Sequence, residues 1–226
     1  MDNTFNELQN GLFLIKKEKG LCLTDGVLEL YADFSKMKRR LKAGNLNTEM
    51  LVKAVKLKKH TGLLRVLDAT AGLGEDSSIL ASAGFNVDMY EYDKVIYSLL
   101  SDGIERASSD PDLREMTNRM HLFNEDSISA MRRIAACPEN SPYNVIFLDP
   151  MFPERQKSSL VKKKFQLLHK LEMPCGNEEE LLEAAIALHP EKIVIKRPAK
   201  GPFLSGRKPD YSLSGKAVRY DCIVNI

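Results

Sequence analysis

The sequence predicts an α/β fold: a mostly parallel, twisted sheet with helices on both faces, preceded by a small N-terminal β-hairpin and helix extension. Apolar runs of strand length alternate with segments of helical periodicity from about residue 61 onward. A glycine turn opens the first of these helices, and a later apolar run ends in Asp-Pro. With 226 residues, the chain is expected to form one such domain with an appendage, divided into residues 1–60 and 61–226.

The N-terminal part is expected to hold short antiparallel strands followed by a basic helix. Residues 12–16 and 26–34 are apolar or alternating, and charged residues lie between them. Residues 47–59 place apolar side chains on one face and lysines elsewhere. This spacing predicts an amphipathic helix that Asn47 caps.

The remaining segments predict the alternating strands and helices of the parallel sheet. The expected strands cover residues 63–67, 86–92, 120–123, 144–148, 192–196 and 217–224. The expected helices cover residues 75–83, 94–107, 127–136, 159–170 and 178–188. Gly84 follows the first of these helices, where a glycine commonly ends a helix. Residues 200–210 are rich in Gly, Pro and basic side chains, which predicts a surface loop.

Composition and charge narrow the possible functions. With 43% hydrophobic and 28% charged residues, the chain has no run near the roughly 20 apolar residues of a membrane span. The start does not resemble a secretory signal, so we expect a cytoplasmic protein that does not bind membranes. The scattered cysteines and histidines predict free thiols and no metal site. The net charge of +2 is small, but basic runs at 36–42, 53–59 and 157–164 flank the candidate site.

Asp68, Gly72, Gly74 and Glu91 form the first half of that site. The glycine turn after a strand lets backbone amides approach a nucleoside-containing ligand, and Asp68 can accept hydrogen bonds from it. Glu91 ends the next strand, where a carboxylate can hold ribose hydroxyls. A dinucleotide site would carry a third glycine where Ser77 stands, so we expect S-adenosylmethionine rather than NAD.

Asp126 and Ser127 follow the third strand of the parallel sheet. Asp126 can bind an adenine amino group and Ser127 can cap the next helix. For each residue, a plain helix cap is the alternative interpretation.

Asp149, Pro150 and Phe152 form the second half of the site, at the end of an apolar strand. The exocyclic amine of a nucleobase is a poor nucleophile because its lone pair is delocalised into the ring. A carboxylate and a backbone carbonyl can orient that amine, and Phe152 can stack on the base, a contact worth about 1–3 kcal/mol. A plain Asp-Pro turn is the alternative. Together with the glycine turn, this pattern predicts a methyltransferase that acts on a nucleobase.

These residues resemble the class I S-adenosylmethionine-dependent methyltransferases, which have a Rossmann-like fold, and within them the ribosomal RNA small subunit methyltransferase J family. The resemblance rests on residues 68–74, 148–153, 156–163 and 194–198, and it extends from about residue 12 to the C-terminus. The Asp-Pro-Met-Phe-Pro block is its most specific part. The resemblance implies methylation of the exocyclic N2 amine of a guanosine near the 3′ end of 16S ribosomal RNA, with this RNA or the small ribosomal subunit as partner.

The same resemblance implies which side chains contact the cofactor: Glu75, Asp76, Glu91, Tyr92, Asp126, Ser127 and Asp149. Family members often carry Arg where Glu75 and Tyr92 stand. Two other functions stay open. One is an adenine amino-methyltransferase of DNA or RNA, whose strand-end block more often carries two prolines and a Tyr; Met151 argues against it. The other is a catalytically silent RNA-binding module, which the intact Asp149 and glycines disfavour.

Overall fold

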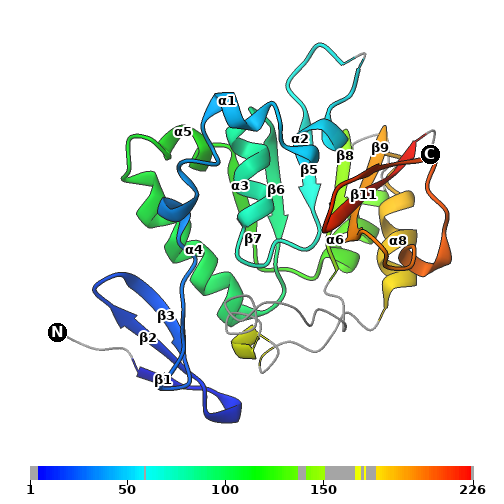
Figure 1. The fold of residues 1–226 in the computed structure, drawn as a ribbon. Coiled ribbons are helices and arrows are strands. Elements are labelled where there is room, and N and C mark those ends of the chain that lie inside the picture. The colour runs from blue at the N-terminus through cyan, green and yellow to red at the C-terminus, as the bar shows by residue number, and fades with distance from the viewer. Residues whose placement is uncertain are drawn as a thin grey trace.

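The computed structural model describes residues 5–58, 60–136, 141–150, 166–168, 171 and 177–224. It contains a four-stranded sheet with the order β1-β2-β3-β4 and a seven-stranded sheet with the order β10-β11-β9-β8-β5-β6-β7 (Figure 1). The small sheet consists of β1 (Phe5–Glu7), β2 (Phe13–Lys17), β3 (Gly20–Thr24) and β4 (Glu29–Leu30). The large sheet consists of β5 (Arg65–Asp68), β6 (Asn86–Tyr90), β7 (Met120–Phe123), β8 (Val145–Leu148), β9 (Lys192–Pro198), β10 (Tyr211–Ser214) and β11 (Val218–Val224).

The helices of the described residues lie between these strands. The α-helices are α1 (Ala43–Leu46), α2 (Met50–Val55), α3 (Glu75–Ser82), α4 (Lys94–Ser108), α5 (Arg114–Thr117), α6 (Ser127–Ala135) and α8 (Glu178–Ile186). Short 3-10 helices cover Gln9–Gly11, Phe34–Met37 and Leu204–Gly206. In the part of the chain described, no helix has both the length and the apolar character needed to cross a membrane.

The large sheet is mostly parallel, as predicted. Strands β5 to β9 pair in parallel, whereas β11 runs antiparallel to β9 and β10 runs antiparallel to β11. The chain moves from the central β5 outward through β6 and β7, then returns to the other side of β5 for β8 and β9. The order therefore reverses between β5 and β8, and an open α/β sheet binds ligands at the carboxyl ends of such strands.

Helices cover both faces of this sheet, which confirms the predicted fold class. Successive residues of a strand point to opposite faces. Val66 joins a core cluster with residues of α2 and α3, and Leu67 joins a second cluster with residues of α6 and α8. Because both faces are covered, β8 is a continuous apolar run, and all four of its residues are buried.

The small sheet differs from the expectation in its second strand. Residues 26–34 were expected to form that strand, but the partner of β2 is β3, and only Glu29–Leu30 pair further along. Gly20, with φ +119°, lets the chain reverse directly after Lys17, so the hairpin is shorter than the hydrophobic pattern indicates. Asp102 of α4 holds this sheet, because it accepts hydrogen bonds from the Leu21 amide at 3.0 Å and from Lys16.

The helix expected over residues 47–59 is also shorter in the structure. It covers only α2, with Glu49 at its N-cap position, and Asn47 instead follows the last residue of α1. The expectation that Asn47 caps this helix was therefore wrong. Both short helices contribute buried residues to the core of the large sheet. The boundary proposed at residue 60 stays a prediction.

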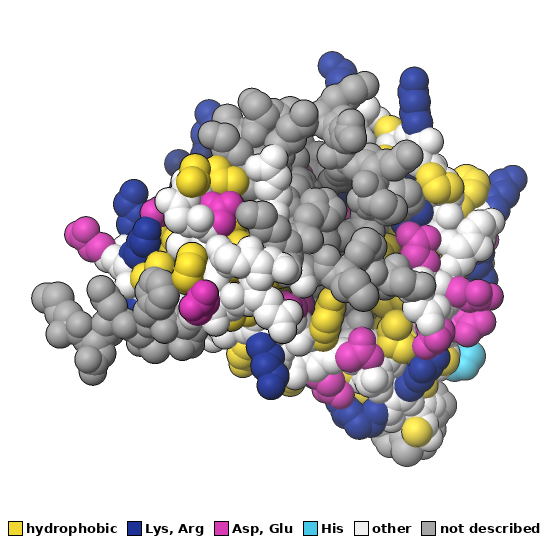
Figure 2. Space-filling model, turned by 90° about the horizontal axis from the view of Figure 1, so that it is seen from below, with side chains coloured by type: hydrophobic (Ala, Val, Ile, Leu, Met, Phe, Trp, Pro, Cys, Tyr) yellow, Lys and Arg dark blue, Asp and Glu magenta, His cyan; other side chains and the backbone are white. Residues whose placement is uncertain are grey.

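Two further differences concern the C-terminal half. Strand β10 was not expected, because its exposed polar sequence lacks an apolar alternation, yet it pairs with β11 from Tyr211 to Ser214. The expected helix over residues 159–170 lies mostly outside the described residues. Seen from below, the described part of the surface mixes acidic, basic and apolar side chains (Figure 2).

Candidate active site

The candidate site lies at the carboxyl ends of β5 and β8, where the strand order reverses. Asp68 ends β5, and Asp149 follows the last residue of β8. The Asp149 amide donates a hydrogen bond of 2.7 Å to Oγ1 of Thr70, in the loop after β5. The two sequence segments predicted to form the site are thus in direct contact.

The glycine turn takes the predicted form. Gly72 and Gly74 have φ angles of +53° and +73°, a region in which side chains other than that of glycine are strained. A Cβ atom on Gly74 would also lie 2.7 Å from Cδ1 of Leu100, so a larger residue would require that side chain to shift. Helix α3 starts directly after Gly74.

Glu91 and Asp68 are buried carboxyl groups whose hydrogen-bond donors are mostly backbone amides. Glu91, only 6% exposed, accepts hydrogen bonds from the Gly72 amide at 3.1 Å and the Asp93 amide at 2.9 Å. Burial raises its pKa to about 7, against the opposing effect of these hydrogen bonds. Asp68 accepts hydrogen bonds from the Thr70 amide at 3.0 Å and from the Ser77 hydroxyl, and burial raises its pKa to about 6.

Two residues of this region were missed by the sequence reasoning as site residues. Lys196, in β9, forms ion pairs with Asp76 of α3 and, at 2.8 Å, with Asp149. The signal that could have found it is a lysine directly after the apolar run Ile193–Ile195, at the carboxyl end of a strand. Asn124 donates hydrogen bonds to the backbone carbonyls of Glu91 and Tyr92, at 2.9 and 3.3 Å, and so joins the ends of β6 and β7.

Comparison with known proteins identifies the family. The sequence profile described as "Putative SAM-dependent methyltransferase" matches residues 6–225. The chain belongs to this family of S-adenosylmethionine-dependent methyltransferases. It is 40% identical to a protein named ribosomal RNA small subunit methyltransferase J from Pseudoalteromonas atlantica, across 97% of this chain and 87% of that protein. A protein of the same name from Pseudomonas aeruginosa is 45% identical, across 80% of this chain and 68% of that protein.

Solved structures agree with the family assignment. The S-adenosylmethionine-dependent methyltransferase NGO1261 from Neisseria gonorrhoeae is 29% identical, with a TM-score of 0.76, over 97% of this chain and 85% of that one. The ribosomal RNA methyltransferase aviRa from Streptomyces viridochromogenes is 14% identical, with a TM-score of 0.52, over 80% and 84% of the two chains, and shows the fold alone. The predicted cofactor of this methyltransferase, S-adenosylmethionine, is confirmed.

The residues present fit this cofactor, which is a nucleoside that carries a sulfonium cation. The glycine turn leaves no side chains at Gly72 and Gly74. The buried carboxyl group of Glu91 accepts a hydrogen bond from the Gly72 amide, and that of Asp68 accepts one from the Thr70 amide. Carboxylates suit both ribose hydroxyls and positive charge. Among the described residues, no cluster of His, Cys, Asp and Glu side chains could hold a metal ion.

The other predicted site residues lie in varied settings. Glu75, the first residue of α3, and Tyr92, in the loop after β6, are exposed. The Asp76 side chain contacts Lys196. Asp126 accepts a hydrogen bond of 2.8 Å from the Ser129 amide, so it is Asp126 that caps α6, and Ser127 is the first residue of that helix. The expectation that Ser127 caps the helix was therefore wrong. The roles of these residues toward the cofactor stay predictions.

The two remaining predicted catalytic residues follow Asp149 in the chain. Pro150 is buried directly after the strand end. Phe152 lies outside the described residues, as do the basic residues at 157 and 162–164. The stacking role of Phe152 therefore stays a prediction.

Proposed function

We propose that this protein transfers a methyl group from S-adenosylmethionine to the exocyclic N2 amine of a guanosine near the 3′ end of 16S ribosomal RNA. The substrate, either this RNA or the small ribosomal subunit, is supported by relatives at 40–45% identity named ribosomal RNA small subunit methyltransferase J. The observation that carries the proposal is the contact between the Asp149 amide and Thr70, because it joins the loop after β8 to the cofactor loop. The expected location is the cytoplasm, where ribosomes are assembled.

The cofactor side of the site is built from the ends of β5 and β6. We assign Glu91 to the ribose hydroxyls, and Asp68 with the backbone of Gly72 and Gly74 to the remainder of the nucleoside and its cationic tail. Glu75, Asp76, Tyr92, Asp126 and Ser127 complete the proposed contacts. When bound, S-adenosylmethionine supplies an electrophilic methyl group on a sulfonium.

The acceptor side is built from the end of β8. The Asp149 carboxylate accepts a hydrogen bond from the exocyclic amine, and the Pro150 carbonyl is assigned as the second acceptor. These contacts orient the amine and stabilise the positive charge that forms on nitrogen as the methyl is transferred. We assign Phe152 to stacking on the base. Alignment of the amine with the methyl group supplies much of the rate enhancement.

The experiment that tests the function is to map the methylated nucleotide. The protein is incubated with isotopically labelled S-adenosylmethionine and, in separate reactions, with deproteinised 16S ribosomal RNA or small subunits from cells that lack the modification. The expected result is a single N2-methylguanosine near the 3′ end, located by nuclease mapping and mass spectrometry. Label in adenine of RNA or of a DNA control would instead show an adenine methyltransferase. Cofactor binding without transfer to any of these substrates would contradict the proposal.

A further inference from the structure

Lys196 joins two carboxylates that come from different elements. Its Nζ lies 2.8 Å from Oδ2 of Asp149, after β8, and it also forms an ion pair with Asp76 in the first turn of α3. The side chains of Lys196 and Asp76 are 16% and 17% exposed, and that of Asp149 is 28% exposed. One cation therefore links the helix that starts at the glycine turn to the strand-end aspartate.

The electrostatic setting keeps Lys196 charged. Burial alone would lower the pKa of its ammonium group, but the carboxylates of Asp149 and Asp76 outweigh burial and raise it. Tyr220, opposite Lys196 on β11, stays neutral, because burial raises its pKa to about 12. If the ammonium group were removed, the partly buried carboxylates of Asp76 and Asp149 would both lose this ion pair.

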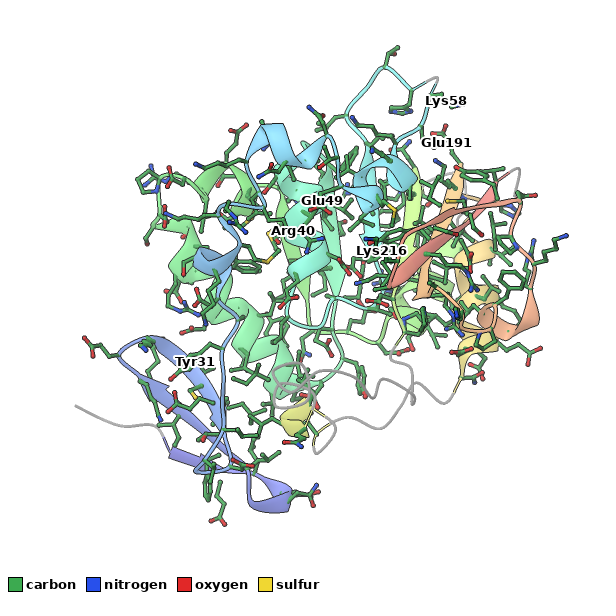
Figure 3. All side chains as sticks on the ribbon, in the orientation of Figure 1. Tyr31, Arg40, Glu49, Lys58, Glu191 and Lys216 are labelled. Atoms are coloured by element: carbon green, nitrogen blue, oxygen red, sulfur yellow. The ribbon has the colours of Figure 1, made fainter. Side chains whose placement is uncertain are left out.

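Arg40 is another cation near Asp76, but Glu49 engages it. Its Nε and Nη2 atoms donate hydrogen bonds of 2.6 and 2.9 Å to the two carboxylate oxygens of Glu49. Figure 3 shows these two side chains pointing toward each other beside α3. Lys196, rather than Arg40, thus bridges Asp76 and Asp149.

Two contacts of the described residues hold the backbone and the side chain of Asp149. Thr70 accepts the hydrogen bond from its backbone amide, and Lys196 binds its carboxylate at Oδ2. We propose that Lys196 is a positioning residue for methyl transfer, which holds the Asp149 carboxylate in the orientation that receives the exocyclic amine of the target base. This inference rests on the proposed function of Asp149. A displacement of about 1 Å in such a contact costs about 100-fold in rate.

The test compares Lys196→Met and Lys196→Arg with a matched control, Lys192→Met. Lys192 lies on the same strand and is also buried, but it donates hydrogen bonds to the carbonyls of Ala54 and Lys56 rather than to carboxylates. Steady-state methylation of 16S ribosomal RNA is measured together with cofactor affinity by calorimetry. We expect Lys196→Met to lower kcat about 100-fold, with the KM for RNA within about threefold of wild type. The Kd for S-adenosylmethionine should change much less than kcat, although Asp76, a proposed cofactor contact, also loses its ion pair with Lys196. Lys196→Arg should recover part of the loss, and Lys192→Met should keep kcat.

A double-mutant cycle with Asp149→Asn separates positioning from general support of the fold. If Lys196 acts through Asp149, Lys196→Met causes no further loss of kcat in the Asp149→Asn background. Losses that multiply, a Kd for S-adenosylmethionine that weakens in step with kcat, or a Lys196→Met enzyme within about threefold of wild type would each overturn the proposal. If Lys196→Met does not fold, Lys196→Arg takes its place in the cycle.

Failure of this inference can be told apart from failure of the proposed function. A wild-type protein that methylates no ribosomal RNA contradicts the proposed function itself. An active wild type beside an equally active Lys196→Met variant contradicts only the role of Lys196.

Discussion

The two ends of strand β9 carry the same residue type in opposite settings. At the amino end, Lys192 donates hydrogen bonds of 2.8 and 2.7 Å to the carbonyls of Ala54 and Lys56, and burial lowers its pKa. At the carboxyl end, the carboxylates near Lys196 outweigh burial and raise its pKa. One lysine completes the C-terminus of α2, and the other holds acidic side chains in place. The same strand thus contacts the end of α2 with one lysine and carboxylates of the candidate site with the other.

Buried acidic residues at the candidate site and away from it also differ in their hydrogen-bond partners. Away from the site, Asp88 accepts hydrogen bonds from the Arg65 guanidinium and the Tyr143 hydroxyl, at 2.7 and 2.8 Å. At the carboxyl end, Glu91 accepts hydrogen bonds from two backbone amides, and Asp68 accepts them from one amide and from hydroxyl groups. Burial raises the pKa of both carboxyl groups. Carboxyl groups buried in this way lower stability when ionised, a cost typical of binding sites. Figure 3 shows Glu191 and Lys58 at the upper end of the molecule, near the start of β9.

The largest effect is expected from Asp149→Ala at the carboxyl end. Removal of the carboxylate takes away the acceptor that orients the amine, so kcat/KM for RNA methylation should fall about 1000-fold or more. The thermal unfolding midpoint should change little, because the side chain is only partly buried. Asp112→Ala, at a 75% exposed aspartate on another surface, is the matched control and should keep full activity. Equal turnover by the Asp149→Ala and wild-type enzymes would contradict the catalytic assignment.

Glu91→Gln should weaken cofactor binding and change the pH dependence of stability. We expect the Kd for S-adenosylmethionine to rise about tenfold, because one charged acceptor is lost. The raised pKa of Glu91, about 7 against an ordinary 4.5, means that its stabilising contribution is full below about pH 4.5 and is lost as the pH rises through 7. The unfolding free energy of the variant relative to wild type should therefore increase between about pH 5 and 8, by at most about 3 kcal/mol. Urea unfolding of the cofactor-free proteins at several pH values measures this difference in unfolding free energy. A difference that does not vary with pH would contradict the raised pKa of Glu91.

The smallest effect on activity is expected from Lys192→Met at the amino end. Loss of two hydrogen bonds to the end of α2 should lower the unfolding free energy by about 1–3 kcal/mol. Because this end of β9 is remote from the reacting groups, kcat should not change. Denaturant titration and the methylation assay are run on the same preparation. A loss of activity at full stability would break the contrast between the two ends of the strand.

The fold could be predicted largely because the central strands are buried on both faces. Runs such as residues 145–148 are continuously apolar, and the helices between them keep their own periodicity. The prediction failed where other interactions decide the structure. Strand β10 is polar and exposed and exists through its pairing with β11. In the N-terminal sheet, the turn at Gly20 and the hydrogen bond from the Leu21 amide to Asp102 determine how β2 pairs with β3. Neither interaction can be predicted from the hydrophobic pattern.

For the site, the residues whose positions follow from strand ends could be predicted. Asp68, Glu91 and Asp149 each lie at or directly after the end of a strand, and parallel strands bring their carboxyl ends to one edge of the sheet. Lys196 could not be placed in the same way, because its role depends on which strand lies beside β8 and on the face toward which it points. Neither the neighbour of β8 in the sheet nor the direction of the Lys196 side chain can be predicted from the order of the strands in the sequence. The Ser127 assignment failed because the two neighbouring residues, Asp126 and Ser127, can both cap a helix.

The hydrogen bond between the Asp149 amide and Thr70 has a mechanical consequence. It fastens the loop proposed to carry the methyl donor to the loop proposed to carry the acceptor, at a distance of 2.7 Å between nitrogen and oxygen. We expect this hydrogen bond to couple the thermal displacements of the two loops, so that the gap between donor and acceptor varies less than the position of either one. On the proposed assignment of the two loops, a single hydroxyl group would set the spacing between the two reactants.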